Sequence, residues 1–285
     1  MVVVVSAPDR PSGRRGDLMA VPLARRAREL RLPLLQPALL RDPAAIAAIA
    51  DLEPAIGVLA DYGQIVPAAI LEIPSYGILN VHPSLLPRHR GATPIPEAIA
   101  AGDPVAGVTL IRMDQGLDTG PIVVQEQWPL TGRETAETLE ATASERSADL
   151  VRRTIGPWLA GSITPQPQPL GGMTLTRPLR REDGRLDPSR SAIELERLVR
   201  AHVPWPGSFV DTRLGRLIVH ETAVRSSEPS DVPGQLAADG DGLALTTTQG
   251  RLLLARVQLA GRRVTDGASL RRGAPGLVGQ AVELR

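Results

Sequence analysis

The 285-residue sequence contains neither cysteine nor lysine. The absence of cysteine excludes disulfides, zinc sites built on thiolates and a cysteine nucleophile. The absence of lysine excludes Schiff-base chemistry and the lysine of a phosphate-binding loop. Aromatic residues make up only 2% of the chain, so leucine, valine, isoleucine and alanine must build the hydrophobic cores.

The sequence also lacks any apolar run of the roughly 18 residues that a membrane-spanning helix needs. The first apolar segment, Val2–Ser6, predicts a short strand rather than a signal peptide. With 42% hydrophobic and 22% charged residues, the composition is that of a soluble protein long enough for two domains. We therefore expect a cytoplasmic protein that does not enter a membrane.

The net charge of +1 is unevenly distributed along the chain. Residues 1–31 carry seven arginines against three acidic residues, and residues 162–285 carry 17 against 13, whereas residues 32–161 carry eight against 15. Basic ends flanking an acidic middle are compatible with a polyanionic partner. Taken alone, these counts favour solvated surface charge in an arginine-rich chain over a polyanionic partner.

The first half of the sequence alternates strand-like and helix-like segments. Short apolar runs predict strands, and apolar residues at helical spacing predict the helices between them. The expected strands are Val2–Ser6, Ala55–Ala60, Ile78–His82, Val105–Met113 and Pro121–Trp128, and the expected helices are Pro22–Leu30, Ala44–Asp51, Ile65–Leu71, Ile95–Ala101 and Glu134–Leu159. This alternation predicts an α/β fold with a Rossmann-like, doubly wound parallel sheet.

The second half has a different pattern. Residues 162–190 are rich in proline and glycine and show little periodicity, which predicts a linker between domains. Ser191 and Glu194 form a capping-box pattern that begins a helix ending before Pro204. Short alternating segments separated by Gly and Asp turns follow, and they predict a small β-barrel. We therefore expect a catalytic domain over residues 1–161, a linker over 162–190 and a second domain over 191–285.

Polar residues with catalytic potential follow two of the expected strands. Asn80 and His82 lie on the same face of one strand, because side chains alternate along a strand. Asp118 lies on a glycine-flanked loop after another strand. An amide and an imidazolium can stabilise an oxyanion while a carboxylate orients the imidazole, which is a set suited to acyl transfer. Taken singly, His82 could also be a hydrogen-bonded histidine of the core, and Asp118 could belong to an ordinary turn.

The segment Ile78-Leu-Asn-Val-His-Pro-Ser-Leu-Leu-Pro87, followed by Leu117-Asp-Thr-Gly-Pro121, resembles the formyltransferase family that uses 10-formyltetrahydrofolate. Further segments are similar to the branch of that family that formylates methionyl-tRNA: Pro8–Arg14, Arg88–Ile95, Gly184–Asp187, Ser191–Val203 and Pro204-Trp-Pro206. The resemblance extends over nearly the whole chain. It aligns Val2–Ser6 with the family's second strand, so we expect the first strand and helix, roughly 30 residues, to be absent.

This resemblance implies a Rossmann-like catalytic domain and a C-terminal OB-like β-barrel that contacts tRNA. It implies that Asn80, His82 and Asp118 are catalytic, and that no metal is needed. The co-substrate 10-formyltetrahydrofolate is expected to contact the loop Ser84, Leu85, Leu86 and Pro87 and the walls formed by Leu59, Asp61, Tyr62, Gly63, Gln115 and Leu117. The loop with Arg10, Arg14 and Arg15 is expected to contact initiator methionyl-tRNA. We expect the enzyme to be a monomer.

Two other interpretations remain open from the sequence. The formyl group could pass to a small molecule such as a sugar nucleotide or glycinamide ribonucleotide, or to water. Alternatively, the chain could be a non-catalytic RNA-binding protein, which its basic ends would suit. Neither small-molecule transfer nor hydrolysis readily explains a basic loop together with the Pro204-Trp-Pro206 entry into a β domain. A non-catalytic protein has no physical need for the Asn80, His82 and Asp118 set.

Overall fold

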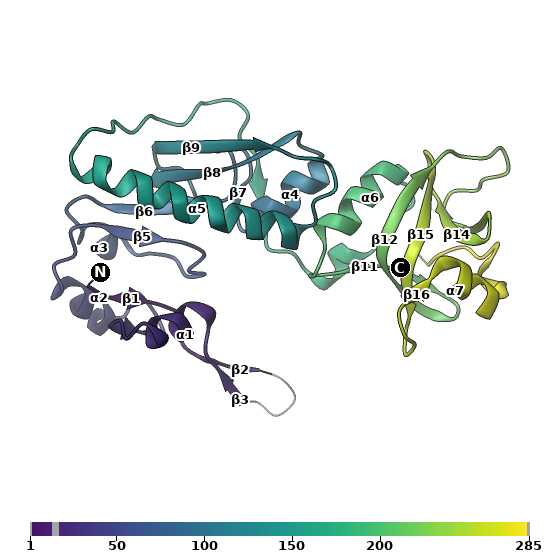
Figure 1. The fold of residues 1–285 in the computed structure, drawn as a ribbon, viewed down its shortest axis with the longest axis horizontal. Helices are drawn as coiled ribbons and strands as arrows, with labels where there is room; N and C mark the ends of the chain where they lie inside the picture. The colour runs from purple at the N-terminus through teal and green to yellow at the C-terminus, as the bar shows by residue number, and fades with distance from the viewer. Residues whose placement is uncertain (1, 13–16, 284–285) are drawn as a thin grey trace. The chain divides into compact units, whose positions relative to one another are not determined.

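The structure, a computed structural model, describes residues 2–12 and 17–283 (Figure 1). The chain divides into two compact units, each built from three segments. Unit 1 comprises Met1–His82, Val108–Glu126 and Ser147–Gly172, and unit 2 comprises Pro83–Gly107, Gln127–Arg146 and Met173–Arg285. We describe each unit separately.

Unit 1 begins with short strands and helices that alternate along the chain. Their bounds are β1 (Val4–Val5), β2 (Arg10–Ser12), β3 (Asp17–Met19), α1 (Pro22–Glu29), β4 (Leu34–Leu35), α2 (Pro43–Ala50), β5 (Gly57–Leu59), α3 (Ala68–Leu71) and β6 (Ile78–His82). Strands β1 and β4 pair in parallel, and β2 and β3 form an antiparallel hairpin that projects away from α1 (Figure 1). Helices α1 and α2 both have proline in the first turn, where its missing N–H costs nothing.

The main sheet of unit 1 has the strand order β5-β6-β8-β9, with β8 over Val105–Arg112 and β9 over Ile122–Pro129. Strand β6 is parallel to β5 but antiparallel to β8. The predicted α/β class is confirmed, and the structure refines the predicted parallel sheet to a mixed one, because β8 runs antiparallel to β6. His82, the last residue of β6, pairs with Thr109 in the middle of β8, whereas Leu79 near the start of β6 pairs with Arg112 at the end of β8, so the two strands run in opposite directions.

A small apolar cluster supports this sheet. Leu40, Ile49, Ile70 and Ile78 are buried together, and half-buried side chains that include Leu59 and Tyr62 pack against them. The cluster joins α2 and α3 to the first residue of β6. Close packing of branched aliphatic side chains therefore holds the strand that carries Asn80 and His82.

The elements of unit 2 come from three parts of the chain. Their bounds are β7 (Arg90–Gly91), α4 (Pro94–Ala101), β10 (Leu175–Thr176), the 3₁₀ turn η1 (Arg181–Gly184), α6 (Ala192–Ala201), β11 (Ser208–Thr212), β12 (Gly215–Arg225), β13 (Leu236–Asp239), β14 (Gly242–Thr246), β15 (Arg251–Leu259), β16 (Thr265–Asp266), α7 (Gly267–Gly273) and η2 (Pro275–Leu277). Helix α5 (Ala136–Leu159) contributes its first turns to unit 2 and the remainder to unit 1.

The C-terminal strands form an antiparallel sheet in the order β11-β12-β15-β14-β13, with β16 paired to β15. Within the described part of the chain, β11 and β13 are the two ends of this order and no ladder joins them. The expected closed barrel is therefore corrected to an open, curved antiparallel sheet. Register shifts near Glu221 in β12 bend the sheet, because a bulge increases local twist.

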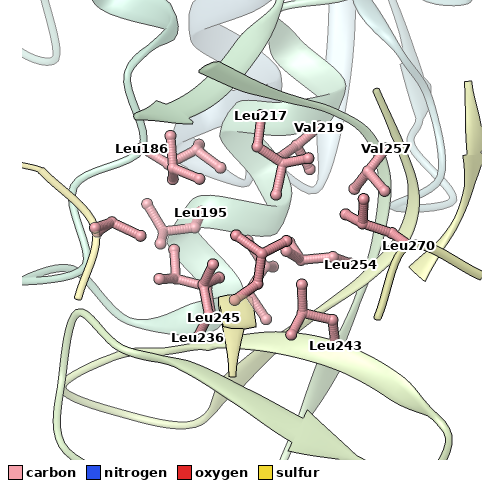
Figure 2. Close-up of a cluster of buried hydrophobic side chains, with 14 of the residues drawn as sticks. Leu186, Leu195, Leu217, Val219, Leu236, Leu243, Leu245, Leu254, Val257 and Leu270 are labelled. Atoms are coloured by element: carbon pink, nitrogen blue, oxygen red, sulfur yellow. The ribbon is translucent and has the colours of Figure 1, made fainter. Parts of the chain in front are cut away.

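Helix α6 closes the apolar face of this sheet, as Figure 2 shows. The core comprises Leu186, Leu195, Leu217, Val219, Leu236, Leu243, Leu245, Leu254, Val257 and Leu270, among others, each at most 4% exposed. The predicted capping box is confirmed, because the Glu194 N–H donates to Ser191 Oγ and the Ser191 N–H donates to Glu194 Oε2. Burial of these aliphatic side chains is the main stabilising contribution in unit 2.

Candidate active site

Strand β6 carries two polar side chains on one face. Asn80 and His82 are 7% and 4% exposed, although neighbouring Leu79 belongs to the apolar core. Asn80 pairs with Leu59 of β5 on one side and with Ile111 of β8 on the other. The two polar residues therefore lie on an interior strand of the sheet, where a buried polar group requires a specific partner.

That partner comes from the loop between β8 and β9. Asp114 orders this loop, because its Oδ1 accepts hydrogen bonds from the Gly116 N–H at 3.0 Å and from the Thr119 hydroxyl at 2.6 Å. Asp118 follows with a φ of +52°, in the left-handed region that non-glycine residues seldom adopt. A residue held in this conformation is a frequent mark of a functional site.

Asn80, His82 and Asp118 meet at the end of β6, and we refer to them as the trio. Asn80 Nδ2 donates to Asp118 Oδ1 at 3.2 Å. His82 Nδ1 lies 3.6 Å from Asp118 Oδ2, within ion-pair distance, and the Asp118 side chain is 12% exposed. The carboxylate thus orients an amide and an imidazole together, and the Nε2 edge of the ring lies away from the Asp118 contact.

The loop after β5 lies beside the trio's strand, because Leu59 is the register partner of Asn80. Asp61 and Gly63 have φ values of +43° and +76°, so this loop turns sharply. Both residues are exposed, whereas Leu59 and Tyr62 are half-buried. The Tyr62 hydroxyl has no hydrogen-bond partner among the described residues, and burial raises the pKa of this phenol.

The other predicted ligand residues of unit 1 lie on the Asp118 loop. Gln115 and Leu117 are both exposed, and Leu117 leaves 61% of its surface open to solvent. An exposed leucine on an ordered loop offers an apolar surface for a flat ring system. The structure therefore brings Leu59, Tyr62, Asn80, His82 and Asp118 into one neighbourhood of unit 1.

Ser84, Leu85, Leu86 and Pro87 belong to unit 2 and follow His82 in the sequence. Ser84 Oγ donates to the Arg88 carbonyl at 2.6 Å, and the Leu86–Pro87 peptide bond is cis. Ser84 and Leu85 line a cavity of about 330 Å³ together with residues of α4, β8 and α5. Asp103 also lines this cavity, where its carboxylate accepts a hydrogen bond from the Arg88 guanidinium and lies 2.8 Å from His89 Nε2.

Of the three arginines predicted to contact tRNA, Arg10 is exposed on β2, whereas Arg14 and Arg15 lie outside the described residues. Among residues 2–12 and 17–283, no group of three or more His, Asp or Glu side chains is arranged to hold a metal ion. No helix in the same part of the chain is long and apolar enough to cross a bilayer.

Comparisons with known proteins decide the family. A family model described as formyl transferase matches residues 1–155, and a second, described as the formyl transferase C-terminal domain, matches residues 178–275. The chain belongs to the formyl transferase family. The resemblance found in the sequence motifs is therefore confirmed.

Individual relatives agree with this assignment. The methionyl-tRNA formyltransferase of Roseiflexus castenholzii is 42% identical over 274 residues, which cover 96% of this chain and 88% of that protein. The structure of methionyl-tRNA formyltransferase from Clostridium thermocellum matches with a TM-score of 0.53 and 20% identity, covering 70% of this chain and 82% of that one. HypX from Aquifex aeolicus in complex with tetrahydrofolic acid matches with a TM-score of 0.53 and 17% identity, covering 86% of this chain and 43% of that one. At these identities, the two structures support the fold alone.

One residue beside the trio of this formyltransferase is not predicted by any sequence motif. Gln168 lies 50 positions after Asp118, and its Nε2 donates to the Asp118 carbonyl at 2.7 Å and to the Gly120 carbonyl at 2.8 Å. The only sequence signal is the alternation Pro165-Gln-Pro-Gln-Pro169, which suggests an extended segment but not its contact.

Gly120 offers a test of how tightly the loop that carries Asp118 is packed in this formyltransferase. A Cβ at Gly120 would lie 2.0 Å from the Arg112 carbonyl oxygen, which is backbone and moves little. We expect Gly120→Ala to lower the free energy of unfolding by about 1–3 kcal/mol, the usual cost of overpacking. Urea unfolding measures this, with Gly156→Ala in α5 as the control. A Cβ at Gly156 meets nothing within 4 Å, so we expect no loss of stability there. Equal free energies of unfolding for Gly120→Ala and Gly156→Ala would contradict tight packing at Gly120.

Proposed function

We propose that this formyltransferase transfers the formyl group of 10-formyltetrahydrofolate to the α-amino group of methionyl-initiator-tRNA. The observation that carries the proposal is the convergence of Asn80, His82 and Asp118 on an interior strand of unit 1. The name of the relative that is 42% identical over nearly the whole chain supports the choice of acceptor.

The trio provides the groups that amine formylation needs. An α-amino group has an ordinary pKa of roughly 8, so a substantial fraction is neutral and can attack directly. Attack on the formyl carbon forms the C–N bond and a tetrahedral oxyanion. Asn80 Nδ2 carries two hydrogens, so it can donate to this oxygen as well as to Asp118, and His82 supplies a second donor. Asp118 or an ordered water takes the amine proton, and a proton passes to the folate nitrogen as its bond to the formyl carbon breaks, which releases tetrahydrofolate.

The residues around the trio fit a folate. Leu59, Tyr62 and Leu117 offer apolar surface to a pteridine, and the hydroxyl of Tyr62 is buried without a partner among the described residues. The backbone of Asp61, Gly63 and Gln115 is available to the ring's polar edge. We propose that Ser84–Pro87, which follow His82 in the sequence, contact the same co-substrate. The proposal requires no metal.

We assign tRNA binding to both ends of the chain. In this proposal residues 1–161 form the catalytic domain, 162–190 the linker and 191–285 the tRNA-binding domain. Arg10, which is exposed on β2, supplies positive charge for the acceptor stem, together with Arg14 and Arg15 next to it in sequence. A tRNA is a polyanion, and arginines contribute to its binding through phosphate contacts.

Formylation of charged initiator tRNA tests the proposal directly. The purified chain is incubated with 10-formyltetrahydrofolate and methionyl-tRNA, and the hydrolysed amino acid is analysed by mass spectrometry. We expect formylmethionine to accumulate with one tetrahydrofolate released for each formyl group. Formate release without formylmethionine, or transfer only to glycinamide ribonucleotide or an amino sugar nucleotide, would contradict the proposal.

Arg10→Ala tests the tRNA side of the proposal. We expect weaker binding of methionyl-tRNA and a dependence of log K on log salt that is shallower by about 1, as for one lost phosphate contact. Affinity for the folate should stay unchanged. Both affinities are measured across a potassium chloride series. Arg152→Ala is the control, because this exposed arginine of α5 is already paired with Asp149. Equal tRNA binding by the two variants would show that Arg10 is solvated surface charge, and a loss of folate binding would show that the hairpin supports the catalytic site.

A further inference from the structure

The start of the proline-rich stretch is bound to unit 1 by backbone hydrogen bonds. The Ile122 N–H donates to the Gln166 carbonyl at 2.7 Å, and the Gln166 N–H donates to the Ile122 carbonyl at 2.8 Å. Ile122 is the first residue of β9, directly after the Asp118 loop. Prolines on both sides of Gln166 and Gln168 restrict φ and keep the segment extended. Residues 165–169 therefore form an extended, conformationally restricted segment that is hydrogen-bonded next to the Asp118 loop. We refer to this segment as the arm.

Gln168 extends from this arm to the Asp118 turn. Its amide nitrogen donates to the carbonyls of Asp118 and Gly120, at 2.7 and 2.8 Å, so one side chain joins two backbone groups of the turn. Both hydrogens of the amide are used in these contacts. The side chain is half-buried, whereas Gln166, two residues earlier, is exposed.

The turn that Gln168 joins has a conformation that needs support. Asp118 has a φ of +52°, which disfavours a residue with a Cβ. Rotation of the peptide between Asp118 and Thr119 would move the Asp118 carboxylate relative to Asn80 and His82. Gln168 opposes this rotation, because the carbonyl that would swing is the one it binds.

We propose that Gln168 is a positioning residue that holds Asp118 in the orientation required for formyl transfer. This inference rests on the proposed function, since it gives Gln168 a role through Asp118. Gln168 itself does not act on the reacting atoms, because its amide is committed to two carbonyls of the turn. The proline-rich stretch thereby contributes to the catalytic site as well as connecting the two halves of the chain.

Three variants of the full chain test the role. Gln168→Ala removes both hydrogen bonds, and Gln168→Glu keeps the shape but replaces the donor with a carboxylate. We expect both to lower kcat for formylation by roughly 10- to 100-fold at neutral pH, with less than a threefold change in the KM for methionyl-tRNA. Gln166→Ala is the matched control, because only the backbone of Gln166 pairs with Ile122, and we expect near-normal kcat. Normal kcat in Gln168→Ala, or normal kcat in Gln168→Glu, would overturn the role as donor.

A double variant tests whether Gln168 acts through Asp118. If it does, adding Gln168→Ala to Asp118→Asn should lower kcat by less than threefold beyond Asp118→Asn alone. Full additivity of the two losses would overturn the positioning role and indicate a separate effect of Gln168 on the fold.

Hydrogen–deuterium exchange separates this inference from the proposed function. We expect amides of residues 116–120 to exchange at least fivefold faster in Gln168→Ala than in wild type or Gln166→Ala, in the absence of substrates. Unchanged exchange would overturn the inference whatever the activity. Faster exchange in Gln168→Ala, together with no formylmethionine formation by the wild-type chain, would instead overturn the proposed function. The contact between Gln168 and the turn would then still stand.

Discussion

Asp118→Asn is expected to lower the rate of formyl transfer to methionyl-tRNA by about 10²–10⁴-fold. Asparagine has the same shape as aspartate and tolerates the left-handed backbone that Asp118 adopts at a φ of +52°. The substitution therefore removes the negative charge 3.6 Å from His82 Nδ1 and a proton acceptor, without a steric cause for unfolding. Single-turnover formylation with saturating tRNA measures the chemical step.

The control for this variant is Asp51→Asn, which neutralises an exposed carboxylate at the end of α2. We expect Asp51→Asn to retain wild-type turnover. His82→Ala should cause a loss similar to that of Asp118→Asn. The double variant should be little worse than either single one, because the carboxylate acts through the imidazole. Near-normal turnover of Asp118→Asn, or strictly additive losses in the double variant, would contradict the role proposed for the trio.

Arg251→Met is expected to lower the free energy of unfolding of unit 2 by about 3–5 kcal/mol, the usual cost of removing one partner of a buried ion pair. The Arg251 side chain is 4% exposed and the Asp231 side chain 8%. Arg251 Nε donates to Asp231 Oδ2 at 2.8 Å, and Nη1 donates to Glu228 Oε1 at 2.8 Å. Methionine fills much of the space, so the loss isolates the uncompensated carboxylate of Asp231.

Calorimetry and chemical denaturation measure this effect, and a second substitution checks its cause. Adding Asp231→Leu to Arg251→Met removes the unpaired charge, so we expect it to recover part of the lost stability. Arg256→Met is the control, because Arg256 and its partner Glu221 are both more than half exposed and such pairs contribute little. Equal destabilisation by Arg251→Met and Arg256→Met would contradict the importance of burial.

The same ion pair makes the stability of unit 2 depend on pH. Hydrogen bonding from Arg251 lowers the pKa of the Asp231 carboxyl below its ordinary value of 3.8. Because the folded-state pKa lies below the unfolded value, this stabilisation is complete above that ordinary value. It is lost as the pH falls through the lowered pKa. We therefore expect the stability difference between wild type and Arg251→Met to be largest near neutral pH and to shrink in acid.

Several features of the fold could be predicted because their causes are local. Strand β6 is predicted over Ile78–His82 and has those bounds, since a short, mainly apolar run lies there between turn signals. The Ser191–Glu194 capping box involves residues three apart and formed as expected. The direction of β8 and the open C-terminal sheet could not be predicted, because hydrophobic alternation does not specify which strand pairs with which.

The sequence by itself determined which elements form and which residue types stand at the end of β6 and on the loop after β8. It also determined the family, through motifs long enough to be specific. Only the tertiary structure decided that Gln168 binds the Asp118 turn and that Arg251 is buried against Asp231. The physical reason is that these contacts join residues 50 and 20 positions apart. Their partners depend on how the chain packs, and no local periodicity, cap or turn encodes that packing.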